Sequence, residues 1–285
     1  MKKWVKRMNR EERARIAQSH NKEMLDKYMK EIVECSKNTK IYHDNETNDF
    51  NENNSINLAN KHKNPVKPIK NEITLLDADT VSAIIEISKQ RKNEEKLCAL
   101  NFASYKHPGG GFLYGAMAQE EALCHESILY NILKSFGSYY NLNSWNLNNN
   151  LYTNRALFTS DVLFSRNSMT YFCDVITCAA PNKRAAKFYK GISDEDNSKA
   201  LKERCKFILD VAEAREIDIL ILGAFGCGVF EQDPKEVVDT FLELLKNYRF
   251  KEVIFAVPSK INDKEDVNYT VFEKEIERYE KKNLL

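Results

Sequence analysis

Hydrophobic and polar positions along the chain follow two alternating patterns, which together predict strands interleaved with helices. Short apolar runs, typical of strands buried on both faces, occupy residues 73–76, 97–103, 171–180, 217–222 and 253–257. Apolar side chains at helical spacing predict helices over residues 10–35, 81–88, 122–136, 201–215, 234–246 and 271–279. Because strands alternate with helices after residue 72, we expect an α/β fold with a mainly parallel sheet.

Three stretches lack such a pattern, and we interpret them as loops. They are rich in Asn, Asp, Ser or Lys and cover residues 39–68, 135–150 and 183–197. The first is long enough to be an accessory insertion, partly disordered. Residues 152–168 carry apolar side chains without a clear period, so the pattern assigns no element there.

The most distinctive stretch is residues 107–121, His-Pro-Gly-Gly-Gly-Phe-Leu-Tyr-Gly-Ala-Met-Ala-Gln-Glu-Glu, between a predicted strand and a predicted helix. Its three consecutive glycines let the backbone approach a ligand without a Cβ in the way. A helix start offers unpaired N–H groups to an anion, and two carboxylates beside such a loop can do acid–base work. Without the glycines, an acidic pair favoured by the helix dipole would explain the two Glu residues equally well.

A second glycine-rich turn, residues 223–230, follows the strand at 217–222 and precedes a helix opened by Asp233-Pro234. Its closely spaced backbone N–H groups make a nest suited to phosphates. The turn is neither a Walker A loop nor a dinucleotide fingerprint, because the required residues and spacing are missing. Ligands of α/β sheets bind at the carboxyl ends of strands, where both turns lie.

Two polar residues near strand ends have open roles. Asp79 follows the strand at 73–76, where it can cap the next helix or read the edge of a ligand, and its position alone favours the cap. Asn101 lies inside a buried strand and needs a partner, either the backbone or a ligand hydroxyl.

Composition narrows the class of protein. Of 285 residues, 42% are hydrophobic and 30% charged, and the net charge of +1 argues against a strongly basic nucleic-acid surface. No apolar run is long enough to cross a bilayer, and the N-terminal stretch lacks the apolar core of a signal peptide. The seven cysteines are odd in number without a Cys-x-x-Cys pair, so we expect reduced core thiols rather than disulfides or zinc ligands. These features predict a soluble intracellular protein, cytoplasmic or nuclear.

Three glycines, a short spacer and Gln-Glu-Glu resemble the signature of poly(ADP-ribose) glycohydrolases, and the chain is similar to their microbial-type family, built on a macrodomain fold. The likeness is carried by residues 10–18, 100–121, 179–182, 223–234 and 253–257. Two features depart from the pattern, namely the insertion at 39–68 and Phe225, where many relatives have tryptophan.

The resemblance implies a three-layer α/β/α macrodomain-like fold with a mixed sheet. Residues 1–70 would form an N-terminal helical extension with an Asn-rich loop, and residues 71–285 the catalytic domain. Asp79 would read the adenine, the second glycine turn would wrap the diphosphate, and Asn101 and the first glycines would contact the distal ribose. The implied substrate-binding residues are Asp79, Asn101, Gly109, Gly110, Gly111, Gln119, Gly226, Cys227, Gly228, Val229 and Phe230.

The implied reaction is hydrolysis of the ribose–ribose O-glycosidic bond of poly(ADP-ribose), releasing ADP-ribose. Glu121 would act as general acid and then as base, Glu120 would position ribose hydroxyls and the leaving chain, and Gln119 would orient the pair. A helix N-terminus favours the carboxylate of Glu121, whereas neighbouring Glu120 and a bound diphosphate favour its acid form, so we expect Glu121 to be a competent acid chiefly when substrate is bound. Neither a metal nor another cofactor is required.

Two alternatives remain, an ADP-ribose-binding macrodomain that reads without cleaving, and a hydrolase acting on single ADP-ribose groups. The intact Glu120-Glu121 pair favours the glycohydrolase. The expected partners are poly(ADP-ribose) or ADP-ribosylated proteins as substrates. We expect a monomer with no membrane contact and no sequence-specific nucleic-acid binding.

Overall fold

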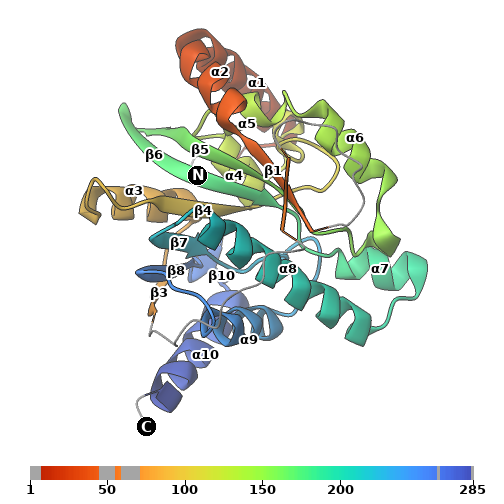
Figure 1. Cartoon of the computed structure of the whole chain (residues 1–285). Coiled ribbons are helices and arrows are strands. Elements are labelled where there is room, and N and C mark those ends of the chain that lie inside the picture. Colours follow the sequence, from red (N-terminus) through yellow and green to blue (C-terminus); the bar gives the residue numbers. More distant parts are fainter. Residues whose placement is uncertain (1–7, 45–54, 59–70, 262–263, 284–285) are drawn as a thin grey trace.

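The computed structural model describes residues 8–44, 55–58, 71–261 and 264–283. An eight-stranded sheet in the order β2-β1-β5-β6-β4-β7-β8-β3 forms its middle layer. Helices cover both faces (Figure 1), each over a separate apolar core. The expected three-layer α/β/α fold with a mixed sheet is confirmed.

Each of the five apolar runs that the sequence predicted corresponds to a strand, with ends that differ by at most two residues. The strands are β1 (Lys40–His43), β2 (Ser55–Asn57), β3 (Glu72–Leu76), β4 (Leu97–Phe102), β5 (Arg155–Arg166), β6 (Met169–Cys178), β7 (Ile219–Leu222), β8 (Glu252–Ala256) and a small separate pair, β9 (Lys260–Ile261) and β10 (Lys264–Glu265). The block β6-β4-β7-β8-β3 is parallel throughout, whereas β5 runs antiparallel to β1 and β6. The carboxyl ends of the five parallel strands therefore meet at one edge.

The predicted loop over residues 39–68 is wrong where the structure describes it. β1 pairs with β5 and buries Ile41 and Tyr42, and β2 extends the sheet beyond β1. The four residues of β1 and the three of β2 were not recognised as strands because the surrounding sequence is strongly polar. The rest of the predicted loop, residues 45–54 and 59–68, lies outside the described residues. The division of the chain into an N-terminal extension, residues 1–70, and a catalytic domain, residues 71–285, stays a prediction.

β5 was missed because a bulge breaks its period. The register against β6 shifts between Thr159 and Val162, and Asp161 within the bulge has a φ of 54°. An extra residue reverses which face the following side chains occupy, so no regular alternation of apolar and polar residues survives along the strand.

The helices are α1 (Arg10–Lys27), α2 (Met29–Asn38), α3 (Thr80–Gln90), α4 (Gln119–Cys124), α5 (Leu129–Leu133), α6 (Gly137–Trp145), α7 (Lys183–Lys190), α8 (Asp194–Ala214), α9 (Pro234–Leu245) and α10 (Val267–Asn283). The predictions at 81–88, 201–215, 234–246 and 271–279 are confirmed as α3, α8, α9 and α10. The predicted helix at 10–35 is two helices, α1 and α2, broken at Tyr28.

The predicted helix at 122–136 is also interrupted, and here the cause is a contact with the sheet. Between α4 and α5 the backbone pairs with β5, because Ile128 N–H donates to Leu163 O (3.1 Å) and Ser165 N–H donates to Glu126 O (2.7 Å). These bonds replace the helical ones, so the chain turns before α5 begins.

Two of the predicted loops contain helices. Residues 135–150 form α6 and a short 3-10 turn, because Tyr139 and Tyr140 bury their rings and this packing outweighs the polar composition. Residues 183–197 form α7 and the start of α8. Local signals for α7 were present: Asn182 accepts from Ala185 N–H (3.0 Å) as the N-cap, and Gly191 ends the helix with a φ of 61°.

The two cores fix the sheet between its helical layers. One face packs against α8, α9 and α10, where the ring of Phe255 lies 6.2 Å from that of Phe241 and 5.5 Å from that of Phe272. The other face packs against α2, α3, α5 and α6. None of the helices in the described part of the chain is long and apolar enough to cross a membrane.

Candidate active site

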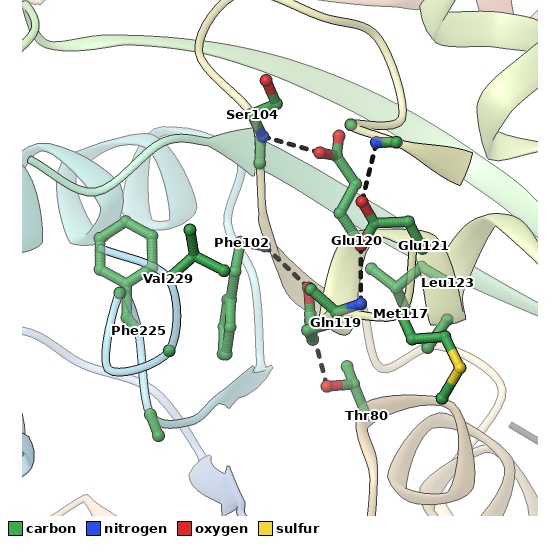
Figure 2. A pocket seen from close by; sticks show the side chains of 18 of the residues that line it. Thr80, Phe102, Ser104, Met117, Gln119, Glu120, Glu121, Leu123, Phe225 and Val229 are labelled. Carbon is green, nitrogen blue, oxygen red and sulfur yellow. Dashed lines mark hydrogen bonds between the residues drawn. The ribbon is translucent and has the colours of Figure 1, made fainter. Parts of the chain in front are cut away.

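The first residue of α4 ties that helix to the sheet. The Gln119 amide donates to Leu100 O (2.8 Å) and to Thr80 Oγ1 (3.1 Å), and its oxygen accepts from Phe102 N–H (2.8 Å). Figure 2 shows the bonds of Gln119 to Phe102, at the end of β4, and to Thr80, at the start of α3. Gln119 thereby fixes the place from which Glu120 and Glu121 project.

Glu120 is a buried carboxyl group, 2% exposed. Its Oε2 accepts from Ser104 N–H (2.7 Å), and its Oε1 accepts from the Asn101 amide (3.3 Å). Burial raises the pKa of Glu120 to about 8 against the opposing effect of the Ser104 bond, and the neighbouring charge of Glu121 raises it further. Much of the Glu120 population therefore holds a proton at neutral pH.

Glu121, 6% exposed, is held by the glycine loop itself. Gly111 N–H donates to its Oε1 (2.8 Å), and Ala118 N–H donates to its Oε2 (2.8 Å). Each oxygen has a backbone donor and retains a second lone pair. The loop thus determines the orientation of this carboxylate before any ligand arrives.

The glycines permit the loop to lie over the acidic pair. Gly109 and Gly110 have φ values of 65° and 59°, which favour glycine. A Cβ on Gly110 would lie 2.6 Å from Glu121 Oε1 and 3.0 Å from Glu120 Oε2. The sequence predicted close approach to a ligand at these glycines, and the structure adds close approach to the carboxylates.

Asp79 makes the helix cap that its position predicted. Its Oδ1 accepts from Ser82 N–H (3.0 Å) and lies 3.5 Å from the Arg166 guanidinium. Arg166 also forms a two-bond ion pair with Glu126, just beyond α4. The Asp79 side chain is therefore positioned through Arg166 relative to the helix that carries the acidic pair.

The second glycine-rich turn is open in the sense that several of its backbone N–H groups have no acceptor among the described residues. Gly226 has a φ of 77°, and a Cβ there would lie 2.7 Å from Ala180 Cβ. Within the described part of the chain, the N–H groups of Gly226, Gly228, Val229 and Phe230 have no hydrogen-bond acceptor. These donors are available to an anion.

Cys227 differs from its neighbours in this turn. Its N–H donates to Ala224 O (3.2 Å), and burial raises the pKa of its thiol to about 12. It is a neutral thiol at physiological pH. All seven cysteines are free and six are buried, as the reduced-thiol prediction requires.

One cavity of about 1050 Å³ joins the two turns. In Figure 2, Phe225 and Val229 of the second turn lie across it from the acidic pair. Ten of the predicted residues line it, Asp79, Gly110, Gly111, Gln119, Glu120, Glu121, Gly226, Gly228, Val229 and Phe230, whereas Asn101, Gly109 and Cys227 do not. Glu121 therefore faces the same crevice as the phosphate-type turn.

Sequence reasoning missed other residues of the cavity wall. Tyr114 and Tyr130 come from either side of the acidic pair, and Asp266 and Asn268 come from the start of α10, far along the chain. Tyr114 lies within the stretch 107–121 but was not singled out there, and no motif marks the other three. Within the described residues, no group of three or more His, Cys, Asp or Glu side chains is placed to hold a metal ion.

Helix α1 forms hydrogen bonds to the loop that lies between the three glycines and the acidic pair. Arg10 Nε donates to Tyr114 O (3.0 Å), Arg13 Nε donates to Gly115 O (2.9 Å), and Gln18 Nε2 donates to Leu113 O (3.3 Å). A Cβ on Gly115 would lie 2.2 Å from Arg10 O, so glycine is required for this approach. The N-terminal helix is therefore part of the structure that supports the site.

Comparison with known proteins agrees with this geometry. Residues 12–167 match the family model of the microbial-type PARG catalytic domain. A crystal structure of poly(ADP-ribose) glycohydrolase from Thermomonospora curvata, bound to the inhibitor ADP-HPD, has 26% sequence identity and a TM-score of 0.76, covering 93% of this chain and 100% of that chain.

The corresponding enzyme from Deinococcus radiodurans in complex with ADP-ribose has 28% identity and a TM-score of 0.71, covering 87% of this chain and 97% of that chain. Among curated protein sequences, none matches this chain. The family model spans more than half of the 285 residues, and the sheet, the two glycine turns and the acidic pair are assembled around one cavity. The chain belongs to the family of microbial-type poly(ADP-ribose) glycohydrolase catalytic domains.

Proposed function

We propose that Glu121 is the general acid and base with which this poly(ADP-ribose) glycohydrolase cleaves the ribose–ribose O-glycosidic bond. The observation that carries the proposal is the placement of Glu121 on a cavity shared with Gly226, Gly228, Val229 and Phe230, whose N–H groups have no acceptor among the described residues. A nucleoside diphosphate bound to those N–H groups would place its distal sugar toward the acidic pair.

The chemistry requires a proton for the leaving oxygen and a base for the attacking water. Glu121 would supply the proton as the C–O bond breaks through an oxocarbenium-like state, and would then take a proton from water. Gly111 and Ala118 hold its two oxygens, so no reorientation is needed between the steps.

Glu120 would act differently. Because burial keeps much of it neutral at pH 7, its carboxyl can donate a hydrogen bond to a sugar hydroxyl. It would also add little negative charge beside Glu121, which leaves the substrate diphosphate as the main negative charge that favours the acid form. This refines the expectation that Glu121 is a competent acid chiefly in the complex.

The remaining site residues are proposed to bind the terminal ADP-ribose. Asp79 would read the adenine, Gly226, Gly228, Val229 and Phe230 would hold the diphosphate, and Gly110 and Gly111 would lie against the distal ribose. Asn101 is fully buried and bonded to Glu120, which supports a positioning role rather than direct contact.

We also propose that residues 71–285 form the catalytic domain, with residues 1–70 as its extension, and that the protein acts in the cytoplasm or nucleus. Its seven free cysteines support a reducing compartment.

The test is Glu121→Gln assayed on radiolabelled poly(ADP-ribose). We expect the release of free ADP-ribose to fall by about 10²–10⁴-fold, because acid–base catalysis is lost. Calorimetric titration with ADP-ribose should show retained binding. Glu277→Gln, an exposed substitution on α10, is the matched control.

Activity of Glu121→Gln equal to that of the wild type would refute the assignment. If Glu121→Gln also loses ADP-ribose affinity, Glu121→Asp separates the effects, because it keeps two acceptor oxygens but withdraws them from the sugar. Parallel assays on proteins carrying a single ADP-ribose show whether the enzyme acts on that linkage too.

A further inference from the structure

Tyr114 is an exposed aromatic residue at the edge of the active-site cavity. It ends the 3-10 turn η2 (Phe112–Tyr114), between the three glycines and the acidic pair. Phe112 of the same turn is fully buried, whereas Tyr114 is 72% exposed and still lines the cavity. The turn therefore presents one ring to the core and the other to the mouth of the site.

The backbone that carries Tyr114 is fixed from both sides. Its N–H donates to Gly111 O (3.0 Å), the residue whose own N–H binds Glu121, and its carbonyl accepts from Arg10 Nε (3.0 Å). Gly115 follows in a left-handed conformation against α1. An aromatic ring on an anchored backbone loses little conformational freedom when a ligand packs on it.

Arg10 adds a positive charge at the backbone carbonyl of Tyr114. It is exposed and uses Nε for the Tyr114 carbonyl, and its two terminal nitrogens have no acceptor among the residues that the structure describes. A planar guanidinium with free donors suits a phosphate group. An aromatic ring on the cavity wall and a guanidinium bonded to the backbone of the same residue are thus held together at this edge of the site.

The substrate explains what this pair would bind. The oxygen that leaves when the bond breaks belongs to the adenosine ribose of the preceding polymer unit, so the adenine and diphosphate of that unit lie close to the scissile bond. We propose that Tyr114 and Arg10 form a subsite for this preceding unit, with the tyrosine ring stacking on its adenine and the guanidinium pairing with its diphosphate. The proposal rests on the assignment of Glu121 above.

This subsite is distinct from the site of the terminal ADP-ribose. The terminal unit lies between the turn at 223–230 and Glu121, on the near side of the scissile bond, whereas Tyr114 and Arg10 would contact only what lies beyond it. The subsite would therefore favour polymer over substrates whose leaving group lacks a nucleotide.

Tyr114→Leu and Tyr114→Phe are compared on poly(ADP-ribose) and on a synthetic ADP-ribose with a small aryl leaving group at the distal anomeric carbon. For Tyr114→Leu, we expect the ratio of kcat/KM on polymer to kcat/KM on the small substrate to fall about tenfold, the size of one base–aromatic stack. Tyr114→Phe, which keeps the ring, should restore the ratio. Tyr189→Leu, at a tyrosine that is 73% exposed on α7 and outside the cavity wall, is the control.

Arg10→Met should weaken the salt dependence of KM for polymer, because one phosphate contact is lost. A Tyr114→Leu variant that lowers kcat/KM equally on both substrates, or on neither, would overturn the subsite. These outcomes are separate from failure of the Glu121 assignment, which is judged by Glu121→Gln on the same substrates.

Discussion

The two glycine-rich turns of the active site use glycine for opposite purposes. In the first, glycines allow the loop to close over Glu120 and Glu121, whose four oxygens accept bonds from Ser104, Asn101, Gly111 and Ala118. In the second, the N–H groups of residues 226 and 228–230 have no acceptor within the described chain. A catalytic carboxylate has to be oriented before substrate binds, whereas an anion site is completed by the anion itself.

The comparison predicts its largest effect at Gly110. Gly110→Ala places a Cβ 2.6 Å from Glu121 Oε1 at a φ of 59°, so the loop has to move away from the carboxylate. We expect the free energy of unfolding to fall by about 2–4 kcal/mol from left-handed strain and overpacking. We also expect kcat on poly(ADP-ribose) to fall by about 10²-fold, since misplacement of this order can cost that much.

The matched substitution is Gly228→Ala in the open turn. A Cβ there meets no atom within 4 Å, so stability measured by urea unfolding should change by less than about 0.5 kcal/mol. If both variants lose the same stability, the two turns do not differ in the way the comparison claims.

The sequence predicted the parts of this site that are local, and missed the parts that depend on distant packing. The spacing of glycines and Gln-Glu-Glu lies within residues 107–121, and Asp79 lies three residues from the N–H that it caps. The hydrogen bond from Arg10 to the Tyr114 carbonyl joins residues 104 positions apart. In the sequence, Arg10 is only one basic residue in a highly charged helix, so nothing there predicts this contact. Geometry of this kind exists only after the helix has packed on the loop.

The same reasoning explains the missed elements of the fold. The bulge in β5 interrupts the alternation of apolar and polar residues by which a strand is predicted. Helix α6 forms because two tyrosine rings are buried in the core, although the surrounding stretch is polar. The buried position of Asn101 was predicted to need a partner, and its amide donates both to Glu120, 19 residues away, and to Thr177 on the neighbouring strand β6. The sequence established the need for a partner and could not identify it.

A second effect, smaller per pH unit than the loss expected for Gly110→Ala, concerns the pH dependence of stability. Burial raises the pKa of Glu120 from 4.5 to about 8, so below 4.5 the folded and unfolded states both hold the proton. Between these values the unfolded state releases its proton while the folded state keeps it, so stability falls as pH rises. The slope should reach at most about 1.4 kcal/mol per pH unit and should vanish above pH 8.

Glu120→Gln should remove this slope, because the side chain no longer ionises. Chemical denaturation of both proteins between pH 5 and pH 9 measures it, with Glu277→Gln as control. A wild-type profile that is flat over this range would show that Glu120 is ionised in the folded protein, and that the first turn does not hold a buried proton.

The smallest effect on stability is expected at Asp79, where a substitution can distinguish a helix cap from a residue that binds the adenine. Asp79→Ser keeps a good N-cap for α3 but removes the carboxylate that lies 3.5 Å from Arg166. Stability should therefore change by only a few tenths of a kcal/mol, since a long, partly exposed ion pair contributes little. If the carboxylate also accepts a hydrogen bond from adenine, calorimetric titration should show ADP-ribose binding about tenfold weaker, the loss expected for one charge-assisted bond. ADP-ribose affinity equal to that of the wild type would leave Asp79 as a helix cap alone, and the adenine would then have to be recognised by other residues of the cavity wall, such as Asp266 and Asn268.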